Sequence, residues 1–158
     1  MVINRQRRVS VASPLLEQFF VRIARLLQIA PDAATVCLVT NAQIARWNRT
    51  YRGKAKPTDV LSFPAEPVAM KKRIARKGPT STTGRRHSPS RNGSYLGDIA
   101  IAPAVARRNA QQSGRAFDDE MRILMLHGVL HLLGYDHETD RGQMERLELR
   151  LRRQLGIQ

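Results

Sequence analysis

Three of the four histidines in this chain lie close together, in the string HGVLHLLGYDH. His127 and His131 are four residues apart, so on a helix both would project from the same face, one turn apart. Gly134 can adopt the left-handed conformation that ends a helix, and such a turn would carry His137 back toward the first pair. Three imidazoles with a further open position are typical of catalytic zinc sites, although nickel, copper and iron also accept imidazole ligands. The spacing therefore predicts a metal centre held by His127, His131 and His137.

Core packing and a purely structural ion account for these histidines less well. Burying three imidazoles among leucines costs free energy unless each ring finds a partner, which argues against three packed core residues. A purely structural ion is also disfavoured, because closed structural zinc sites usually have four ligands, mostly cysteines. Asp136 stands beside the third histidine, and we expect it to support that ligand, with a fourth ligand as the alternative. The remaining histidine, His87, is expected to be solvated.

The residue after the first histidine bears on the substrate. The spacing of the three histidines, with Gly134 between them, is also that of the metzincin proteases, in which a glutamate follows the first histidine as the general base. Here that position is Gly128, and a glycine cannot accept a proton. The pattern thus keeps the ligands and lacks the base of a peptidase. In a polycationic chain this favours a phosphodiester substrate, whose cleavage needs mainly a Lewis acid and a cation to hold the anionic group.

The charge of the chain indicates a polyanionic partner. Its 158 residues hold 27 Lys and Arg against 13 Asp and Glu, which gives a net charge of +14 and a pI near 11.4. Nucleic acid is the first candidate for such a surface. A single cysteine, Cys37, excludes an intramolecular disulfide and a zinc site built from several cysteines. No apolar run approaches the ~18 residues of a membrane helix, so we expect a cytoplasmic protein with no membrane partner.

Residues 67–94 differ from the rest of the chain. They hold eight Lys and Arg, no Asp or Glu, and many Gly, Pro, Ser and Thr. This composition cannot bury enough apolar surface to offset the entropy of ordering the chain. We predict a mobile basic insertion between two strands of one domain that spans 1–158. It is either a solvated loop with no role or a tether for the RNA backbone that acts through counterion release.

Hydrophobic periodicity and turn residues predict the remaining elements. Strands are expected at 2–12, 34–39, 60–63 and 96–102. A helix from 13 ends before Pro31, and a short helix follows the capping box of Thr40 and Gln43. Further helices are expected at 103–112, 118–133 and about 140–155, and Cys37 and Trp47 are expected in the core. The order βαβαββααα predicts an α+β fold, with a small mixed sheet of about four strands packed with about five helices and the histidines on a central helix and the following turn.

Three blocks of sequence resemble one known family. The histidine string is similar to the signature of the YbeY family, bacterial rRNA-maturation metalloproteins described as single-strand-specific endoribonucleases. NRTYRGK at 48–54 with PTDVLSFP at 57–64 resembles the second block of that family, and LGDI at 96–99 resembles the third. The blocks stand in the expected order over most of the chain. The basic stretch at 67–94 is a departure, because the family has a shorter connection there.

The resemblance implies roles for particular residues. It implies one zinc ion per chain, held by His127, His131 and His137. It also implies an essential arginine at Arg52, and the planar guanidinium fork of arginine suits bidentate binding of phosphate. Thr58 and Asp59 would either shape the wall of a cleft or cap a strand. Asp98 is expected to be structural.

The leading hypothesis is a zinc-dependent, single-strand-specific endoribonuclease that acts in 16S rRNA 3′-end maturation and late-stage ribosome quality control. The expected partners are rRNA, the small ribosomal subunit and its proteins, and a ribosome-assembly GTPase, with no DNA. One alternative is a non-catalytic ribosome-assembly factor that binds small-subunit rRNA and uses zinc to order its fold. Another is a metal-dependent hydrolase of a different substrate class. Whether water or the RNA 2′-hydroxyl attacks stays open.

Overall fold

The computed structural model describes residues 1–65 and 95–157, and their elements follow the predicted order. The strands are β1 (Val2–Asn4), β2 (Ala34–Leu38), β3 (Val60–Pro64) and β4 (Gly97–Ile101). The helices are α1 (Ser13–Leu27), α2 (Asn41–Arg52), α3 (Pro103–Gln112), α4 (Phe117–Leu132) and α5 (Gln143–Leu155). The prediction of an α+β fold of this size is confirmed. The segment 67–94 lies outside the described residues, so the loop expected there stays a prediction, as does the single domain.

The four strands form one mixed sheet in the order β1-β2-β4-β3. β1, β2 and β4 run parallel, whereas β3 pairs antiparallel with β4. Ser62 of β3 stands opposite Ile99 of β4. At the end of this pair the amide of Ala65 donates to the carbonyl of Leu96 at 2.9 Å. The residues on either side of the basic segment are therefore held next to each other.

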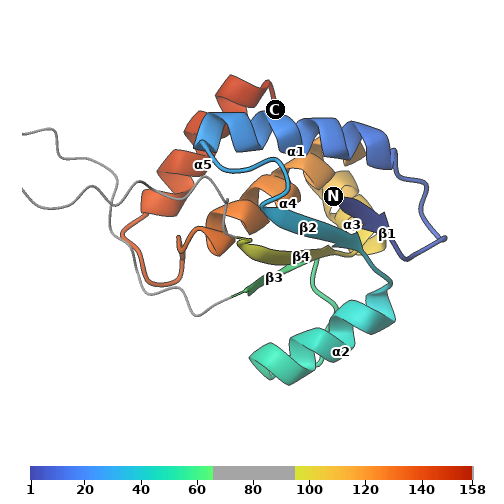
Figure 1. The fold of residues 1–158 in the computed structure, drawn as a ribbon. Helices are drawn as coiled ribbons and strands as arrows, with labels where there is room; N and C mark the ends of the chain where they lie inside the picture. The colour runs from blue at the N-terminus through green and yellow to red at the C-terminus, as the bar shows by residue number, and fades with distance from the viewer. Residues whose placement is uncertain (66–94, 158) are drawn as a thin grey trace, which may run out of the picture.

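Helices cover the two faces of the sheet unequally (Figure 1). α1, α4 and α5 pack on one face and enclose the larger core, to which β4 contributes Ile99 and Ile101. α2 lies on the other face over a smaller cluster that includes Ile44 and Ala100. The alternation along β4 follows from the two-residue period of a strand, which sends successive side chains to opposite faces. β3 is an edge strand of the described sheet, and it contacts α4 on one face and α2 on the other.

Two predicted boundaries were wrong. The strand expected at 2–12 is confined to β1, because the side chain of Gln6 bonds both the amide and the carbonyl of Val9 and closes a loop. The last helix begins at Gln143 instead of about 140, because the carboxylate of Asp140 accepts hydrogen bonds from the amides of Gln143 and Met144. In both places a side chain satisfies backbone groups that a longer element would have paired.

Helix α2 begins as predicted. The Thr40 hydroxyl accepts from the amide of Gln43, and the Gln43 side chain accepts from the amide of Thr40, which completes the capping box. Trp47, expected in the core, is only half-buried at the rim of the smaller cluster, and Cys37 is also half-buried there. Burial raises the pKa of the Cys37 thiol, which favours its uncharged and less nucleophilic form.

Helix α4 is central because it is buried on nearly every side. Its apolar residues include Met121, Met125, Leu126 and Leu130, all fully buried, and it packs against α1, α3, α5, β3 and β4. Acidic residues fill its first turn and complement the positive end of the helix dipole. Among the described residues, no helix combines the length and the apolar character needed to cross a membrane. The packing of α4 gives its histidines a rigid base.

Candidate metal centre

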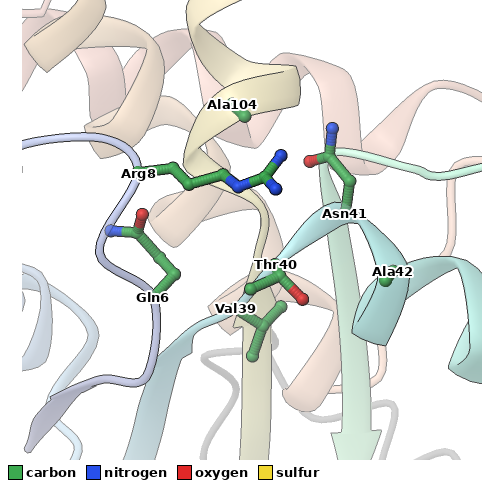
Figure 2. A pocket seen from close by; sticks show the side chains of 7 residues that line it. All are labelled: Gln6, Arg8, Val39, Thr40, Asn41, Ala42 and Ala104. Carbon is green, nitrogen blue, oxygen red and sulfur yellow. The ribbon is translucent and has the colours of Figure 1, made fainter.

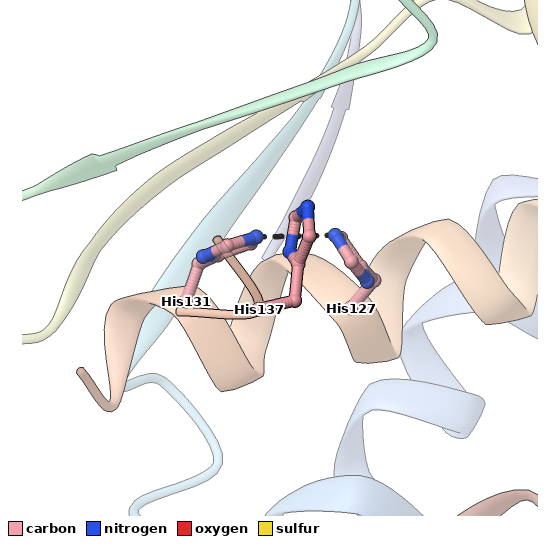
Figure 3. A group of neighbouring side chains, drawn as sticks. All are labelled: His127, His131 and His137. Carbon is pink, nitrogen blue, oxygen red and sulfur yellow. Dashed lines mark hydrogen bonds between the residues drawn. The ribbon is translucent and has the colours of Figure 1, made fainter. Parts of the chain in front are cut away.

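The three histidines predicted as ligands converge on one point (Figure 3). His127 and His131 project from the last two turns of α4, and His137 enters from the turn that follows the helix. The Nε2 atoms of His127 and His131 lie 3.1 Å apart. One ring nitrogen from each of the three residues falls within 4.8 Å of the others. The predicted cluster is therefore assembled in the structure.

These distances suit a shared ion. Two nitrogens bound at about 2.0–2.1 Å to a tetrahedral zinc lie about 3.4 Å apart, close to the separation of the first two histidines. His127 and His131 are partly buried, whereas His137 is exposed. The group thus opens to solvent on the side of His137. An ion held here would keep a position free for a further ligand, as catalytic zinc sites do.

A tight turn places His137. Gly134 has a φ of +88°, in the left-handed region predicted for it, and its amide donates to the carbonyl of His131 at 2.9 Å. The carboxylate of Asp136 accepts from the amide of Glu138 and from the hydroxyl of Thr139. The hydrogen bond from Glu138 holds the pKa of Asp136 below its usual value. Asp136 thus orders the turn that carries the third histidine, and the group of possible ligands found among the described residues does not include it.

Sequence reasoning missed one important residue of this site, Glu148. Its buried carboxylate lies 3.0 Å from Nδ1 of His127 and also pairs with Arg152. Burial pushes the pKa of Glu148 upward, but the hydrogen bond from His127 and the charge of Arg152 outweigh it, so the pKa falls below its usual value. An ionised carboxylate at Nδ1 requires a proton there and leaves Nε2 of His127 free to accept an ion.

A signal for Glu148 was present in the pattern of the last helix. Met144, Leu147, Leu151 and Leu155 recur at helical spacing along α5 and mark its apolar face. In the structure Met144, Leu151 and Leu155 are buried together with Glu148, while Leu147 is only partly buried. Glu148 is four residues after Met144 and three before Leu151, so it occupies the apolar face. A buried carboxylate at such a position needs a hydrogen-bonding or charged partner, and here the partners are His127 and Arg152.

The environment also suits a metal at His131. Burial lowers the pKa of His131, and the neighbouring rings of His127 and His137 lower it further, while the charge of Asp136 acts in the opposite direction. The lowered pKa favours the neutral ring, which is the form that binds a metal.

Close packing explains the glycine that follows the first ligand. A Cβ on Gly128 would lie 2.7 Å from Cγ2 of Ile99 on β4, so α4 approaches the sheet more closely than any other residue would permit. The hydroxyl of Ser62 on β3 also donates to the carbonyl of Gly128 at 3.2 Å. The position that holds a general base in metzincin proteases is here a contact between helix and sheet.

Arg52 is the last residue of α2 and reaches the loop of the third histidine. Its Nη2 lies 2.9 Å from Oε1 of Glu138, the residue next to His137. Both side chains are well exposed, so the ion pair contributes little to stability and its partners can exchange. The fold thus brings the predicted arginine to Glu138, which adjoins His137 and is 86 residues away along the chain.

Comparison with known proteins identifies the family to which the chain is related. The model of the family described as "Endoribonuclease YbeY" matches residues 1–156. The chain belongs to the YbeY family. An endoribonuclease YbeY from Solibacter usitatus is 38% identical over 154 residues, which cover 97% of this chain and 86% of that protein. One from Francisella philomiragia is 33% identical over 159 residues, covering 99% of this chain and 90% of that protein.

A solved structure shares the fold. The solution structure of TM1509 from Thermotoga maritima superposes with a TM-score of 0.58 at 24% identity, over 98% of this chain and 89% of that one. The resemblance to the YbeY family inferred from the three sequence blocks is therefore confirmed by a match over nearly the whole chain.

Further residues of the YbeY-like blocks have structural contacts. One carboxylate oxygen of Asp59 accepts from the amide of Val60 and from Thr58, and the second oxygen accepts from Asn109. Of the two roles considered for Thr58 and Asp59, these contacts support the capping of β3. Asp98 accepts from the Tyr95 hydroxyl at 2.7 Å, as suits a structural residue.

A separate hollow of about 230 Å³ lies where β2 leads into α2 (Figure 2). Its lining includes no His, Cys, Asp or Glu, and Arg8 is the charged side chain in it. Gln6 and Thr40, two of its polar side chains, already bond the backbone, in the loop after β1 and at the start of α2. The hollow therefore lacks the groups for metal binding or proton transfer, and the candidate site remains the histidine group.

Proposed function

We propose that this protein is a metal-dependent endoribonuclease that cuts single-stranded RNA. The observation that carries the proposal is the convergence of His127, His131 and His137 within 4.8 Å, in a chain of a family described as endoribonucleases. The net charge of +14 supports a polyanionic substrate. RNA meets this requirement and agrees with the names of the relatives.

Zinc is the ion that we propose for the histidines, one per chain. Three neutral imidazoles with a free further position are a donor set that zinc accepts, and the closest pair of nitrogens has a suitable separation. When bound, the ion supplies a Lewis acid for the phosphate that is cut. Glu148 keeps His127 in the required orientation and tautomer, and the buried helix α4 holds His127 and His131 rigidly.

Arg52 is the residue that we propose to hold the scissile phosphate. Its guanidinium pairs with Glu138, which adjoins His137, and this exposed partner is easily replaced by a phosphate. The fork of the guanidinium can neutralise the charge that develops on the phosphate oxygens. Glu148 lies behind His127 and is engaged by Arg152, so it serves the ligand instead of the attacking oxygen. Water or the RNA 2′-hydroxyl supplies that oxygen.

The biological setting that we propose is rRNA maturation in the cytoplasm. The substrate would be single-stranded 16S rRNA near its 3′ end, and the protein would also act in late-stage ribosome quality control. The partners would be the small ribosomal subunit with its proteins and a ribosome-assembly GTPase. Membership of the YbeY family and the polycationic surface support this setting.

Cleavage by matched variants tests the proposal. We expect highly purified wild-type protein to cut a single-stranded RNA in the presence of zinc, and Arg52→Ala and His131→Ala to lose most of this activity. His131→Ala should also lose bound zinc, measured by elemental analysis of protein purified without a His-tag, whereas Arg52→Ala should retain it. Arg25→Ala, at an exposed position in the last turn of α1, controls for the loss of one positive charge.

Two outcomes would contradict the proposal. Equal cleavage by wild type, Arg52→Ala and His131→Ala would assign the activity to a contaminant. Normal ribosome maturation in cells that carry Arg52→Ala, with RNA bound but uncut, would support the non-catalytic assembly factor.

A further inference from the structure

Three aromatic rings gather on the side of β3 that faces α2. The chain has one Trp, three Tyr and four Phe, and three of these eight side chains meet here. The ring of Phe63 lies 5.9 Å from that of Trp47 and 5.2 Å from that of Tyr51, both edge-to-face. Trp47 and Tyr51 are four residues apart on α2, so they share one face of the helix. We call Trp47, Tyr51 and Phe63 the aromatic cluster.

The outermost ring of this cluster is open to solvent. Trp47 and Phe63 are half-buried against the smaller core, whereas Tyr51 is 67% exposed. Packing of helix on sheet accounts for the inner two rings. It does not account for Tyr51, which is the most exposed of the large apolar side chains among the described residues. The inner rings give Tyr51 a firm support and leave much of its surface free.

Sequence neighbours of the aromatic cluster contact sequence neighbours of the histidines at two points. Tyr51 immediately precedes Arg52, which pairs with Glu138 beside His137. Phe63 immediately follows Ser62, whose hydroxyl bonds the carbonyl of Gly128 beside His127. Successive residues of β3 point to opposite faces, so the edge of this strand separates the rings from the histidines. A flexible single-stranded nucleic acid that passes round this edge would reach both the rings and the histidines.

The charge around Tyr51 matches a nucleic-acid backbone. From Asn41 to Thr58 the chain carries five cations and no carboxylate, and these cations are Arg46, Arg49, Arg52, Lys54 and Lys56. Apart from Arg52, none of them forms an ion pair within the described part of the chain. Stacked bases on aromatic rings and phosphates on cations form the usual surface for single-stranded nucleic acid. An acidic protein could use the cations, but it has no equivalent need for the free ring.

We propose that Tyr51, supported by Phe63, stacks on an unpaired base of the RNA next to the phosphate held by Arg52. This inference rests on the proposed endoribonuclease function and extends it to the choice of substrate. A base within a duplex is already stacked and paired, so it cannot lie on the ring without being extruded. Tyr51 thereby favours single strands over duplexes.

Binding measurements test the inference independently of cleavage. The probe is a labelled single-stranded RNA of about 12 nucleotides, titrated with the zinc-loaded full-length protein and followed by fluorescence anisotropy, with intact RNA confirmed on a gel. We expect Tyr51→Ala to weaken binding by about 5- to 150-fold, the effect of losing one stacked base. Tyr51→Leu should weaken RNA binding nearly as much, because it keeps apolar surface without a ring. Tyr51→Phe should bind RNA as tightly as wild type, because it keeps the ring.

Three controls separate stacking from other effects. Tyr95→Ala removes a second exposed tyrosine, whose hydroxyl bonds Thr35 and Asp98, and should leave RNA affinity unchanged. The salt dependence of binding should be the same for Tyr51→Ala and wild type, because the ring carries no charge. An RNA duplex of the same sequence should bind both proteins equally.

The outcomes distinguish this inference from the proposed function. If wild-type protein binds RNA and Tyr51→Ala binds it as tightly, or loses single strands and duplexes equally, the stacking inference is wrong while the endoribonuclease stands. If Tyr51→Ala keeps RNA affinity but no longer binds small-subunit proteins, the ring faces a protein instead. If Tyr51→Ala weakens binding as expected and wild-type protein cuts no RNA, stacking stands and the catalytic proposal falls. Wild-type protein that binds no single-stranded RNA would overturn both.

Discussion

Glu148 is not one of the possible metal ligands, but its carboxylate determines which ring nitrogen His127 offers to an ion. Glu148 takes the Nδ1 side of His127, which leaves Nε2 facing the Nε2 of His131 at 3.1 Å. Arg152 holds the other oxygen of Glu148, so the carboxylate stays charged although it is buried. Such partners set the tautomer and orientation of a ligand and raise its basicity. The geometry of the site therefore depends on helix α5 as well as on the helix that carries the ligands.

We expect Glu148→Gln to weaken zinc binding by about 10- to 100-fold, the usual effect of losing the partner of a ligating histidine. The amide has the same shape, but it is neutral and can donate to Nδ1, which would stabilise the wrong tautomer. Competition with a chromophoric chelator measures the affinity. Glu145→Gln, exposed on the same helix, is the control. Equal zinc affinity of Glu148→Gln and wild type would show that Glu148 only anchors α5.

At the scale of elements, the site depends on how closely α4 lies against the sheet. Gly128 permits contact with Ile99, and the hydroxyl of Ser62 bonds the helix at the same point. This contact sets how closely α4 lies to β3 and β4. It thereby also sets the positions of His127, which immediately precedes Gly128, and of His131, one turn later. The edge strand β3 then brings Phe63 to the opposite face, where α2 ends in Tyr51 and Arg52.

We expect Gly128→Ala to lower the free energy of unfolding by about 1–3 kcal/mol, because the added methyl overlaps Ile99. Alanine is otherwise the better helix former by about 1 kcal/mol, so the sign of the effect tests the contact. Ile99→Ala should itself cost about 2–5 kcal/mol. In that background Gly128→Ala should be neutral or stabilising. Chemical denaturation of the four proteins measures the coupling, and an identical effect of Gly128→Ala in both backgrounds would refute it.

At the scale of the whole molecule, positive charge is the dominant feature. Residues 67–94 supply eight of the cations, and the rest of the chain still carries a net charge of +6. Ala65 and Leu96 are joined by a backbone hydrogen bond, so a short linker can connect β3 to β4 in place of the intervening residues. The contribution of this segment to RNA binding can therefore be measured in a chain that keeps its described fold.

We expect replacement of 67–94 by a short Gly-Ser linker to weaken RNA binding and to flatten its dependence on salt. For single strands, the slope of log K against log salt should fall by about 0.7 for each phosphate that the shortened chain no longer neutralises. Anisotropy titrations over a range of salt concentrations measure it, with thermal unfolding as a check on folding. An unchanged slope would identify the segment as a passive loop.

Local spacing was enough to predict the ligands, because an i, i+4 pair on a helix and a glycine turn place His127, His131 and His137 within a few residues of one another. Periodicity likewise predicted the class of fold and the order of its elements. Tertiary structure alone decided the contacts of these residues: Glu148 reaches His127 across 21 residues, Ser62 reaches Gly128 across 66, and Arg52 reaches Glu138 across 86. Such contacts depend on how helices and strands pack, and packing is a property of the complete core that no local pattern contains.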